Sequence, residues 1–520
     1  MPSIIPADLV IDNVTVITMD PNHPFASGVA IAKGNILGLL NKKNENWPLA
    51  PNGKRINGKG LTLLPGLIDA HCHLRAQISR DLSVSCGRED VASIEDIIQA
   101  IRIQACQLPH GTWIRASGYD PFYLKKKCQP TRRDLDQATS THPVRLRHVT
   151  RHASVLNSAA LSLAGIGPNT ADPPGVTVER QPESGVPTGL IYGGDAWLSQ
   201  HVIPPLSLHE LHTGADHLQR FLLSKGITAV QDATPTNAHH DLEFWASQMK
   251  ENWSITIQLM SGEKNHASMA ASLANELPPN NLANHLEMGP VKVVMEANPD
   301  IFPPPDDLIR IASEATRRGV PIAVHVVNPE MVWAAVDAIR NANQHQKNKT
   351  RHRLEHLSLC PEAFLPEIAD QGIMVVTNPN LIYNHGDRYL ADVETSEQNW
   401  LYRMNRVKAA GISLAAGSDA PVASFDPWIG IQTACTRSTA SGQIVNPDEK
   451  LKRWHALAMY TSGAALAGGW ENCRGLISPG YHADLIAVDR NPLTCSADTL
   501  SHVHVHATWI KGRLVYHSPA

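Results

Sequence analysis

PGLIDAHCHL, residues 65–74, joins a short apolar strand to two histidines that stand two positions apart. Side chains two apart on a strand point to the same face, so His71 and His73 can both aim at one metal ion while Cys72 points away. Two hydrogen-bonded surface histidines can give the same pattern. The rest of the chain must therefore decide between a metal site and a surface pair.

Seven further apolar strands follow this one, and segments with helical periodicity lie between them. The predicted strands are residues 63–70, 226–234, 253–262, 289–296, 321–327, 351–358, 372–379 and 412–419. Leu308, Ile311 and Ala315 recur at helical spacing after the fourth strand. Asn328 as a cap and Pro329 in the first turn predict the start of the helix after the fifth strand. Eight β/α units in a row favour an α/β fold with a closed (β/α)8 TIM barrel.

The two ends of the chain show another pattern, in which short β-branched and apolar runs alternate with turns. They predict one discontinuous small β-sandwich domain, formed by residues 1–62 and 471–520, with the barrel spanning residues 63–470. Residues 75–224, after the first barrel strand, form an insertion far longer than a βα loop. Long insertions on the catalytic rim of a barrel usually shape the substrate pocket.

Composition limits the partners of the protein. The formal net charge is −4 and no dense basic segment offsets it, which argues against nucleic acid as a partner. No apolar run approaches the roughly 18 residues that span a bilayer, so no membrane contact is expected. Eight scattered cysteines without a C-x-x-C pair, and no apolar leader, predict a cytoplasmic protein. The sequence does not determine the oligomeric state, and it is compatible with a homo-oligomer.

Chemically active side chains also stand at or inside later strands: Lys292, His325, His356 and Asp419. Because catalytic groups of such barrels come from the carboxyl ends of several strands, these residues are expected to meet the first histidine pair. Neutral imidazoles and a carboxylate suit zinc or a similar divalent ion, which supplies hydroxide at neutral pH. Asp419 is the candidate catalytic group that takes the proton of that water and passes it to a leaving amine.

Lys292 needs a separate explanation, because an ammonium group beside two cations would be repelled. A lysine that has reacted with carbon dioxide becomes a carbamate, an anionic bridge between two metals. The alternative is a lysine that pairs with Glu296 or caps the end of the barrel. Glu355, next to His356 on a strand, is expected to face the opposite side and to be structural.

Six further residues are candidate substrate contacts, since their side chains could hydrogen-bond a substrate carbonyl. Three lie in the insertion and three in a predicted loop after the seventh strand: Tyr119, Asp120 and His152, then Tyr383, Asn384 and His385. Tyr119 and Asp120 could equally form a turn that closes the insertion's own core. The sequence leaves both roles open.

These motifs resemble those of the amidohydrolase superfamily, and the whole chain is similar to its YtcJ-like, Amidohydro_3 branch. The likeness rests on PGLIDAHCHL, GITAVQD, GPVKVV, RLEH, RHASVLNSAALSLAGI and GSDAPVASFDPWIGIQTACTR, among others. The resemblance implies the barrel with its β domain, hydrolysis at a carbon bonded to nitrogen or, less often, oxygen, and a centre of one or two metals. The implied ligands are His71, His73, His325, His356 and Asp419, with a carbamate on Lys292 as the bridge if the site holds two ions.

Two loops depart from the branch. Met295–Ala297 stands where an acidic residue and glycine are usual, and Asn328–Pro329 stands where Gly-Asp is usual. Both loops are expected to border the pocket, so the substrate of a relative cannot simply be transferred. Among substrates, the sequence favours a small molecule with an amide, N-formyl, carbamate or cyclic amide bond.

Two alternative functions are less consistent with the sequence than this hydrolase. A deaminase of the same superfamily, acting on an amidine-like or heterocyclic substrate, would place a glutamate three residues after the fifth-strand histidine, where this chain has Asn328. A non-catalytic scaffold would have lost metal ligands, whereas every ligand position is filled here. Both alternatives are therefore disfavoured.

Overall fold

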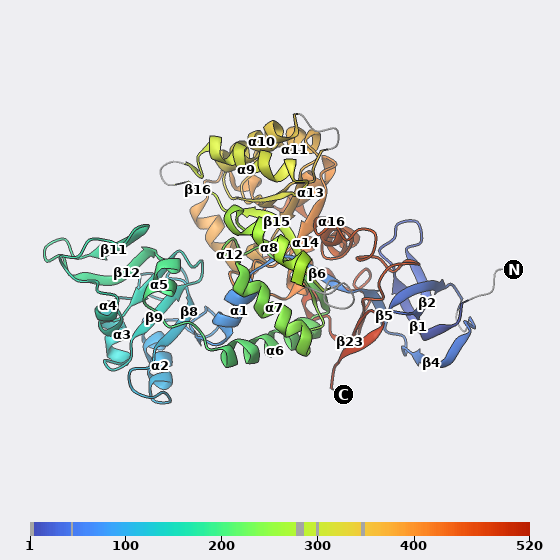
Figure 1. Ribbon diagram of the computed structural model, residues 1–520, viewed down its shortest axis with the longest axis horizontal. Coiled ribbons are helices and arrows are strands. Elements are labelled where there is room, and N and C mark those ends of the chain that lie inside the picture. Colours follow the sequence, from blue (N-terminus) through green and yellow to red (C-terminus); the bar gives the residue numbers. More distant parts are fainter. Residues whose placement is uncertain (1–4, 43–44, 277–284, 298–300, 345–348, 520) are drawn as a thin grey trace. The chain divides into compact units, whose positions relative to one another are not determined.

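The computed structural model describes the chain except residues 1–4, 43–44, 277–284, 298–300, 345–348 and 520. Two compact units are present: one combines Met1–His73 with Gln219–Ala520, and the other is Leu74–Leu218. The first unit contains the barrel and the strands from both chain ends (Figure 1). The second unit contains most of the segment predicted as an insertion.

Eight parallel strands form the central sheet of the first unit, in the order β21-β20-β19-β18-β15-β14-β13-β6. Their bounds are β6 Leu67–Cys72, β13 Ile227–Asp232, β14 Thr256–Ser261, β15 Leu286–Val293, β18 Ile322–Val326, β19 Arg353–His356, β20 Met374–Thr377 and β21 Leu414–Ala416. The two edge strands, β6 and β21, are also linked to each other near their carboxyl ends. The Asp419 amide donates to the His71 carbonyl at 2.8 Å, and the His73 amide donates to the Ala420 carbonyl at 2.9 Å. The predicted (β/α)8 architecture is confirmed.

Helices connect and cover these strands. The longer ones are α6 Leu208–Ser224, α7 His239–Glu251, α8 Glu263–Glu276, α9 Pro305–Arg317, α10 Pro329–Asn343, α12 Pro379–Asp392 and α14 Pro427–Thr436. The shorter ones are α11 Leu365–Asp370, α13 Met404–Ala409, α15 Arg453–Met459 and α16 Ser462–Ala467. Asn328 caps α10 as predicted, because its side-chain oxygen accepts the Met331 amide at 2.9 Å. Val332 and Ile339 on this helix are fully buried in one core with Val324 of β18.

The segment of Tyr383 to His385 is helical, so the prediction of a loop there is wrong. Pro379 occupies the first turn of α12, where its missing amide and fixed φ favour a helix start rather than a break. Ile382 and Gly386, four residues apart, are buried on one face of this helix. Tertiary packing of that face therefore decides the local structure.

The strands near the two ends of the chain form one sheet in the order β24-β23-β22-β5-β1-β2-β3, with β4 paired to β1. Their bounds are β1 Ala7–Ile17, β2 Phe25–Ala32, β3 Asn35–Leu40, β4 Leu49–Asn57, β5 Thr62–Pro65, β22 Leu485–Val488, β23 Val505–Ile510 and β24 Arg513–His517. β5 and β22 pair antiparallel, with Leu63 opposite Ala487. β5 leads directly into β6, so this sheet fixes the entry of the chain into the barrel.

The second unit is built on a six-stranded sheet in the order β11-β12-β10-β9-β8-β7. Its strands are β7 Val84–Ser85, β8 Ile114–Tyr119, β9 Val144–His148, β10 Ala153–Leu156, β11 Val176–Arg180 and β12 Pro187–Gly193. Its helices are α1 Leu74–Asp81, α2 Ile94–Ala105, α3 Arg132–Ala138, α4 Ser158–Leu163 and α5 Asp195–His201. Ile97 and Ile101 of α2 pack with Leu146 and Val155 in the core of this unit.

Across the described part of the chain, no helix combines the length and the apolar character that crossing a membrane would require.

Candidate metal centre

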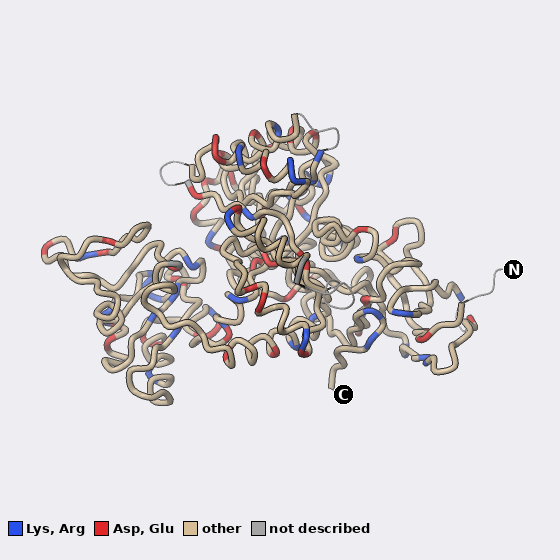
Figure 2. The backbone as a smooth tube through the Cα atoms, in the orientation of Figure 1, with Lys and Arg blue, Asp and Glu red and all other residues tan. Residues whose placement is uncertain are grey.

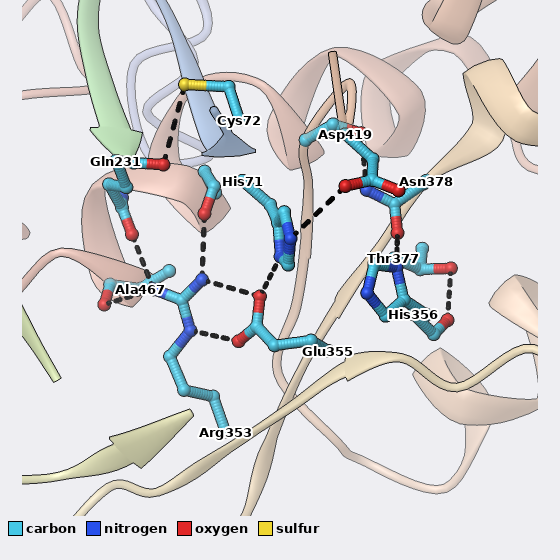
Figure 3. Close-up of polar contacts among 12 residues, drawn as sticks. His71, Cys72, Gln231, Arg353, Glu355, His356, Thr377, Asn378, Asp419 and Ala467 are labelled. Atoms are coloured by element: carbon cyan, nitrogen blue, oxygen red, sulfur yellow. Dashed lines mark hydrogen bonds and ion pairs between the residues drawn. The ribbon is translucent and has the colours of Figure 1, made fainter. Parts of the chain in front are cut away.

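Three predicted ligands converge at the carboxyl ends of the barrel strands. His71 of β6, His356 of β19 and Asp419 after β21 each offer a ligand atom, and these atoms lie within 4.8 Å of one another. The distance from His71 Nε2 to Asp419 Oδ1 is 3.4 Å. All three residues are buried, and Figure 3 shows their side chains on neighbouring elements. Two imidazoles and a carboxylate at this spacing are suitable ligands for one divalent ion.

The other two predicted histidines extend this cluster. His73 Nε2 lies 3.2 Å from Asp419 Oδ1, and the ring centroid of His325 lies 4.7 Å from that of His356. Burial, followed by the charge of Lys292, lowers the pKa of His71 to about 3. Burial also lowers the pKa of His325 well below its usual value. The imidazoles of His71 and His325 are therefore neutral at pH 7, which is the form that donates a lone pair to a metal.

Unusual backbone conformations place two of these ligands. His356 has a φ of +70° and Asp419 a φ of +59°, a left-handed region that costs a side-chain-bearing residue about 1–3 kcal/mol. Gly417 packs directly on β6, since a Cβ atom there would lie 2.3 Å from the His71 backbone nitrogen. The close backbone packing thus holds the strand ends together and keeps His356 and Asp419 in their strained conformations.

The structure contradicts the prediction that Glu355 faces away from the centre. Its carboxylate contacts His71 Nδ1 (Figure 3), while Arg353 Nε donates to Glu355 Oε1 at 2.6 Å and Arg353 Nη2 to Oε2 at 3.0 Å. The reason is the left-handed φ of His356, which ends the alternation of side chains one residue after Glu355.

The contact with Glu355 orients the His71 ring. Burial on its own raises the pKa of Glu355, but the charge of Arg353 and the contact with His71 outweigh it and hold the pKa well below the usual value. The ionised carboxylate accepts the proton of His71 Nδ1, so Nε2 is left free on the side of Asp419. Such a carboxylate–histidine pair commonly fixes the tautomer of a metal ligand.

Two further supporting residues were not predicted from the sequence. Thr234 Oγ1 lies 3.0 Å from His73 Nδ1, and Asn378 Oδ1 lies 2.7 Å from His356 Nδ1. Asn378 is itself fixed, because its Nδ2 donates to the Gly417 carbonyl at 2.9 Å. Asn378 follows β20 directly and Thr234 stands two residues after β13, and that position of a polar residue was the available signal.

Lys292 of β15 is buried, and its charge acts on His71, His325 and His356. Its side-chain nitrogen has no hydrogen-bond partner among the described residues, and Glu296, the partner considered from sequence, is exposed. Burial lowers the pKa of Lys292 to about 8, against the opposing charges of Glu355 and Asp419. An unpartnered buried amine is costly unless another group binds there.

The candidate substrate contacts lie in both units. On α12, the Asn384 side chain accepts the Ser424 amide at 3.2 Å and His385 Nε2 lies 3.0 Å from the Val422 carbonyl. Tyr383 is half-buried. The first two residues therefore hold the segment that follows Asp419, and a substrate contact by any of the three stays a prediction.

In the second unit, Tyr119 is fully buried and its hydroxyl donates to Gln129 at 3.0 Å. Asp120 accepts the Phe122 amide at 2.9 Å, as in a turn, and His152 is exposed. Tyr119 belongs to the core of this unit, which is the alternative foreseen for it. A role of these residues in substrate binding also stays a prediction.

Comparison with known proteins agrees with this geometry. Residues 54–516 match the model of the Amidohydrolase family, Amidohydro_3. The chain belongs to this family. It is 27% identical to the N-substituted formamide deformylase of Arthrobacter pascens over 98% of both chains. It is 25% identical to the putative amidohydrolase YtcJ of Bacillus subtilis (strain 168), over 90% of this chain and 91% of that protein.

A solved structure shares the fold of this amidohydrolase. An uncharacterized metal-dependent hydrolase from Pyrococcus horikoshii OT3 aligns with a TM-score of 0.73 and 20% identity, over 94% of this chain and 99% of that one.

Proposed function

We propose that this amidohydrolase is a metal-dependent enzyme that hydrolyses the C–N bond of a small molecule, and that an N-substituted formamide is the first substrate class to test. One observation carries the proposal: His71, His356 and Asp419 bring their ligand atoms within 4.8 Å. The formamide class is suggested by the deformylase relative, which aligns over 98% of both chains. Other amides, carbamates and cyclic amides remain in the same reaction class.

The side chains fit a divalent ion, and zinc is the proposed metal because neutral imidazoles and a carboxylate are its usual ligands. His71, His73, His325, His356 and Asp419 would hold it. When bound, such an ion supplies Lewis acidity and lowers the pKa of a water molecule toward 7.

We propose two ions if Lys292 is carbamylated. The amine must be neutral to react, and a pKa of about 8 leaves a neutral fraction at pH 7. Its nitrogen lone pair attacks carbon dioxide and the nitrogen loses one proton, which yields an anionic carbamate. The unpartnered position of the buried nitrogen supports this modification.

Asp419 is the proposed proton carrier. Burial raises its pKa, but the hydrogen bond from His73 and the favourable interactions with His356 and His71 outweigh burial and lower the pKa below the usual value. The residue is therefore ionised and can accept the proton of the attacking water. When the water oxygen bonds to the formyl carbon and the C–N bond breaks, that proton passes to the leaving nitrogen, giving formate and a free amine.

The deaminase alternative loses support from the role of Asn328. Its side chain caps α10 through the Met331 amide at 2.9 Å, so it occupies the position of the expected glutamate with a structural contact. Glu330, two residues further on, lies in the first turn of that helix, where a carboxylate is favoured by the helix dipole.

A substrate screen separates the two reactions. Zinc-loaded protein would be offered N-formyl, N-acyl, carbamate and amidine compounds, with formate, other carboxylates and ammonia measured separately. Acid together with a free amine supports the proposal, whereas ammonia from an amidine without acid supports a deaminase. Asp419→Asn should abolish turnover, and Asp370→Asn, whose side chain is 73% exposed, serves as the matched control.

We further propose that the enzyme works in the cytoplasm on a small-molecule substrate. All eight cysteines are free thiols in the structure, which fits a reducing compartment.

A further inference from the structure

Three arginines of the second unit converge on a single carboxylate. Arg145 and Arg147 stand two apart on β9 and so share one face of the sheet, and Arg151 follows this strand. Arg147 Nε lies 3.1 Å from Asp195 Oδ1, Arg151 Nη2 lies 3.0 Å from Asp195 Oδ2, and Arg145 also pairs with Oδ1. Three guanidinium groups against one carboxylate leave two positive charges without a counter-charge in this cluster.

The same face holds polar atoms that lack hydrogen-bond partners. Ser117 lies opposite Arg147 in the register of β8 and β9, and its buried hydroxyl has no partner among the described residues. The Nε atoms of Arg147 and Arg151 also have no hydrogen bond there, although the former is in ion-pair contact with Asp195. Buried polar atoms are usually partnered, so a missing group is indicated at this place.

A fourth arginine adds to the positive field. Arg115 lies opposite Arg145 in the strand register, and its Nη2 donates to the Pro204 carbonyl at 2.6 Å. Glu210 offsets part of its charge. Figure 2 shows basic residues gathered among the strands of this unit.

The electrostatics favour a second anion. Burial, followed by repulsion from Arg145, lowers the pKa of Arg147 to about 9, so Asp195 does not fully compensate the cluster. Burial raises the pKa of Asp195, but the three arginines outweigh it and keep the carboxylate ionised. Asp195 is therefore already a charged partner, and the surplus must be neutralised by something else.

Side-chain exposure increases from one side of the cluster to the other. The Arg145 side chain is 4% exposed and that of Arg147 16%, whereas those of Arg151 and Asp195 are 30% and 28% exposed. A small ion can therefore reach Arg151 first, and Ser117 and Arg145 lie deeper.

We propose that Ser117, Arg145, Arg147 and Arg151 bind a small oxyanion, either a carboxylate or a phosphate. Guanidinium groups present paired N–H donors that match two oxygens of such an anion, and charge-assisted bonds of this type are the stronger ones. The Ser117 hydroxyl would donate one more hydrogen bond. The proposal does not depend on the proposed hydrolysis, since none of these residues belongs to the metal centre.

Isothermal titration of the full-length protein with sodium phosphate and with sodium acetate tests this site, against sodium chloride of the same ionic strength. We expect one of the two oxyanions to bind better than chloride, and the better ligand identifies the class. Arg147→Gln and Arg151→Gln should each weaken that binding roughly tenfold or more. Arg133→Gln, which removes an exposed charge from the same unit, should leave it unchanged.

A variant with the opposite expected effect on oxyanion affinity distinguishes binding at this site from binding at the metal centre. Asp195→Asn removes the internal competitor while keeping the side-chain size, so it should tighten oxyanion binding several-fold. If Arg147→Gln does not fold, Arg151→Gln still tests the site, because the Arg151 side chain is more exposed. The proposal is overturned if neither oxyanion binds better than chloride, or if Arg151→Gln and Asp195→Asn both bind as the unchanged protein does.

Discussion

The barrel and the second unit each bury a cluster of charged side chains, but the two clusters are built with opposite polarity. In the barrel, neutral imidazoles surround Asp419, and Glu355 is paired with Arg353. In the second unit, three arginines surround Asp195. The first cluster offers lone pairs and suits a cation, whereas the second offers N–H donors and suits an anion.

Both clusters contain buried polar atoms without a partner, although such atoms also occur elsewhere among the described residues, as at Asn343. Lys292 in the barrel and Ser117 in the second unit each bury a polar atom without a partner among the described residues. By contrast, Arg474 satisfies its buried charge through Asp484 and donates to Thr256 Oγ1 at 2.8 Å. A buried pair with complete hydrogen bonding needs no ligand, and the following variants test whether that distinction holds.

Replacing His71 should have the largest effect. His71→Ala removes a central ligand, so hydrolysis should fall to background while the circular dichroism spectrum stays that of the folded protein. His240→Ala is the control, because that side chain is 69% exposed on α7. Activity retained in His71→Ala would show that the barrel cluster is not the catalytic centre.

Lys292 tests the number of metal ions. Lys292→Ala should lose one of two metal equivalents, measured by inductively coupled plasma mass spectrometry, if a carbamate bridges two ions. Lys250→Ala, at an exposed position of α7, should keep the full complement. Equal metal content in both variants would reject the bridge.

Glu355 tests the orientation of His71. Glu355→Gln keeps the size of the side chain but removes the charge that fixes the imidazole, so metal affinity and activity should fall about 10–100-fold. The thermal midpoint should also drop, because Arg353 would keep a buried charge without its counter-ion. Glu314→Gln, on the exposed side of α9, is the matched control. An unchanged affinity would assign Glu355 a purely structural role.

His352 is a buried histidine whose two ring nitrogens both have hydrogen-bond partners. Replacing it should therefore affect activity less than any of the variants above. Its Nδ1 accepts the Ile322 amide at 3.1 Å and its Nε2 lies 3.2 Å from Thr316. Burial lowers the pKa of His352 to about 4. The unfolded chain takes up this proton near pH 6.5, so the stability contribution is complete above that pH and is lost as the pH falls toward 4, by about 3 kcal/mol.

Thermal unfolding between pH 7.5 and 4.5 measures this loss. The unchanged protein should lose more stability over this range than His352→Gln does, because the variant lacks the titrating ring. His240→Gln should follow the unchanged protein. Parallel curves for all three would exclude a contribution from His352.

The eight barrel strands could be predicted from the sequence because they depend on short-range patterns, and the same strand ends supplied the proposed metal ligands. An apolar strand ending in a histidine or aspartate is visible in the chain, as at His71, His325 and Asp419. The start of α10 was equally visible, since Asn328 and Pro329 are a local capping signal. Whether the six ligands hold a metal stays a prediction.

Features that depend on tertiary structure were not visible. Glu355 was misplaced because the left-handed φ of His356 cannot be inferred from an alternating pattern. The segment of Tyr383 became part of α12 through packing of Ile382 and Gly386. The arginine cluster also escaped notice, since Asp195 lies 44 residues beyond Arg151 and meets it only in the folded unit.

Metal content of the purified protein tests the central claim most directly. After exposure to zinc and removal of free metal, mass spectrometry should find one or two equivalents per chain, and anomalous scattering from a crystal should place them among His71, His356 and Asp419. A folded protein that retains no metal under these conditions, or that holds it away from these side chains, would contradict the account.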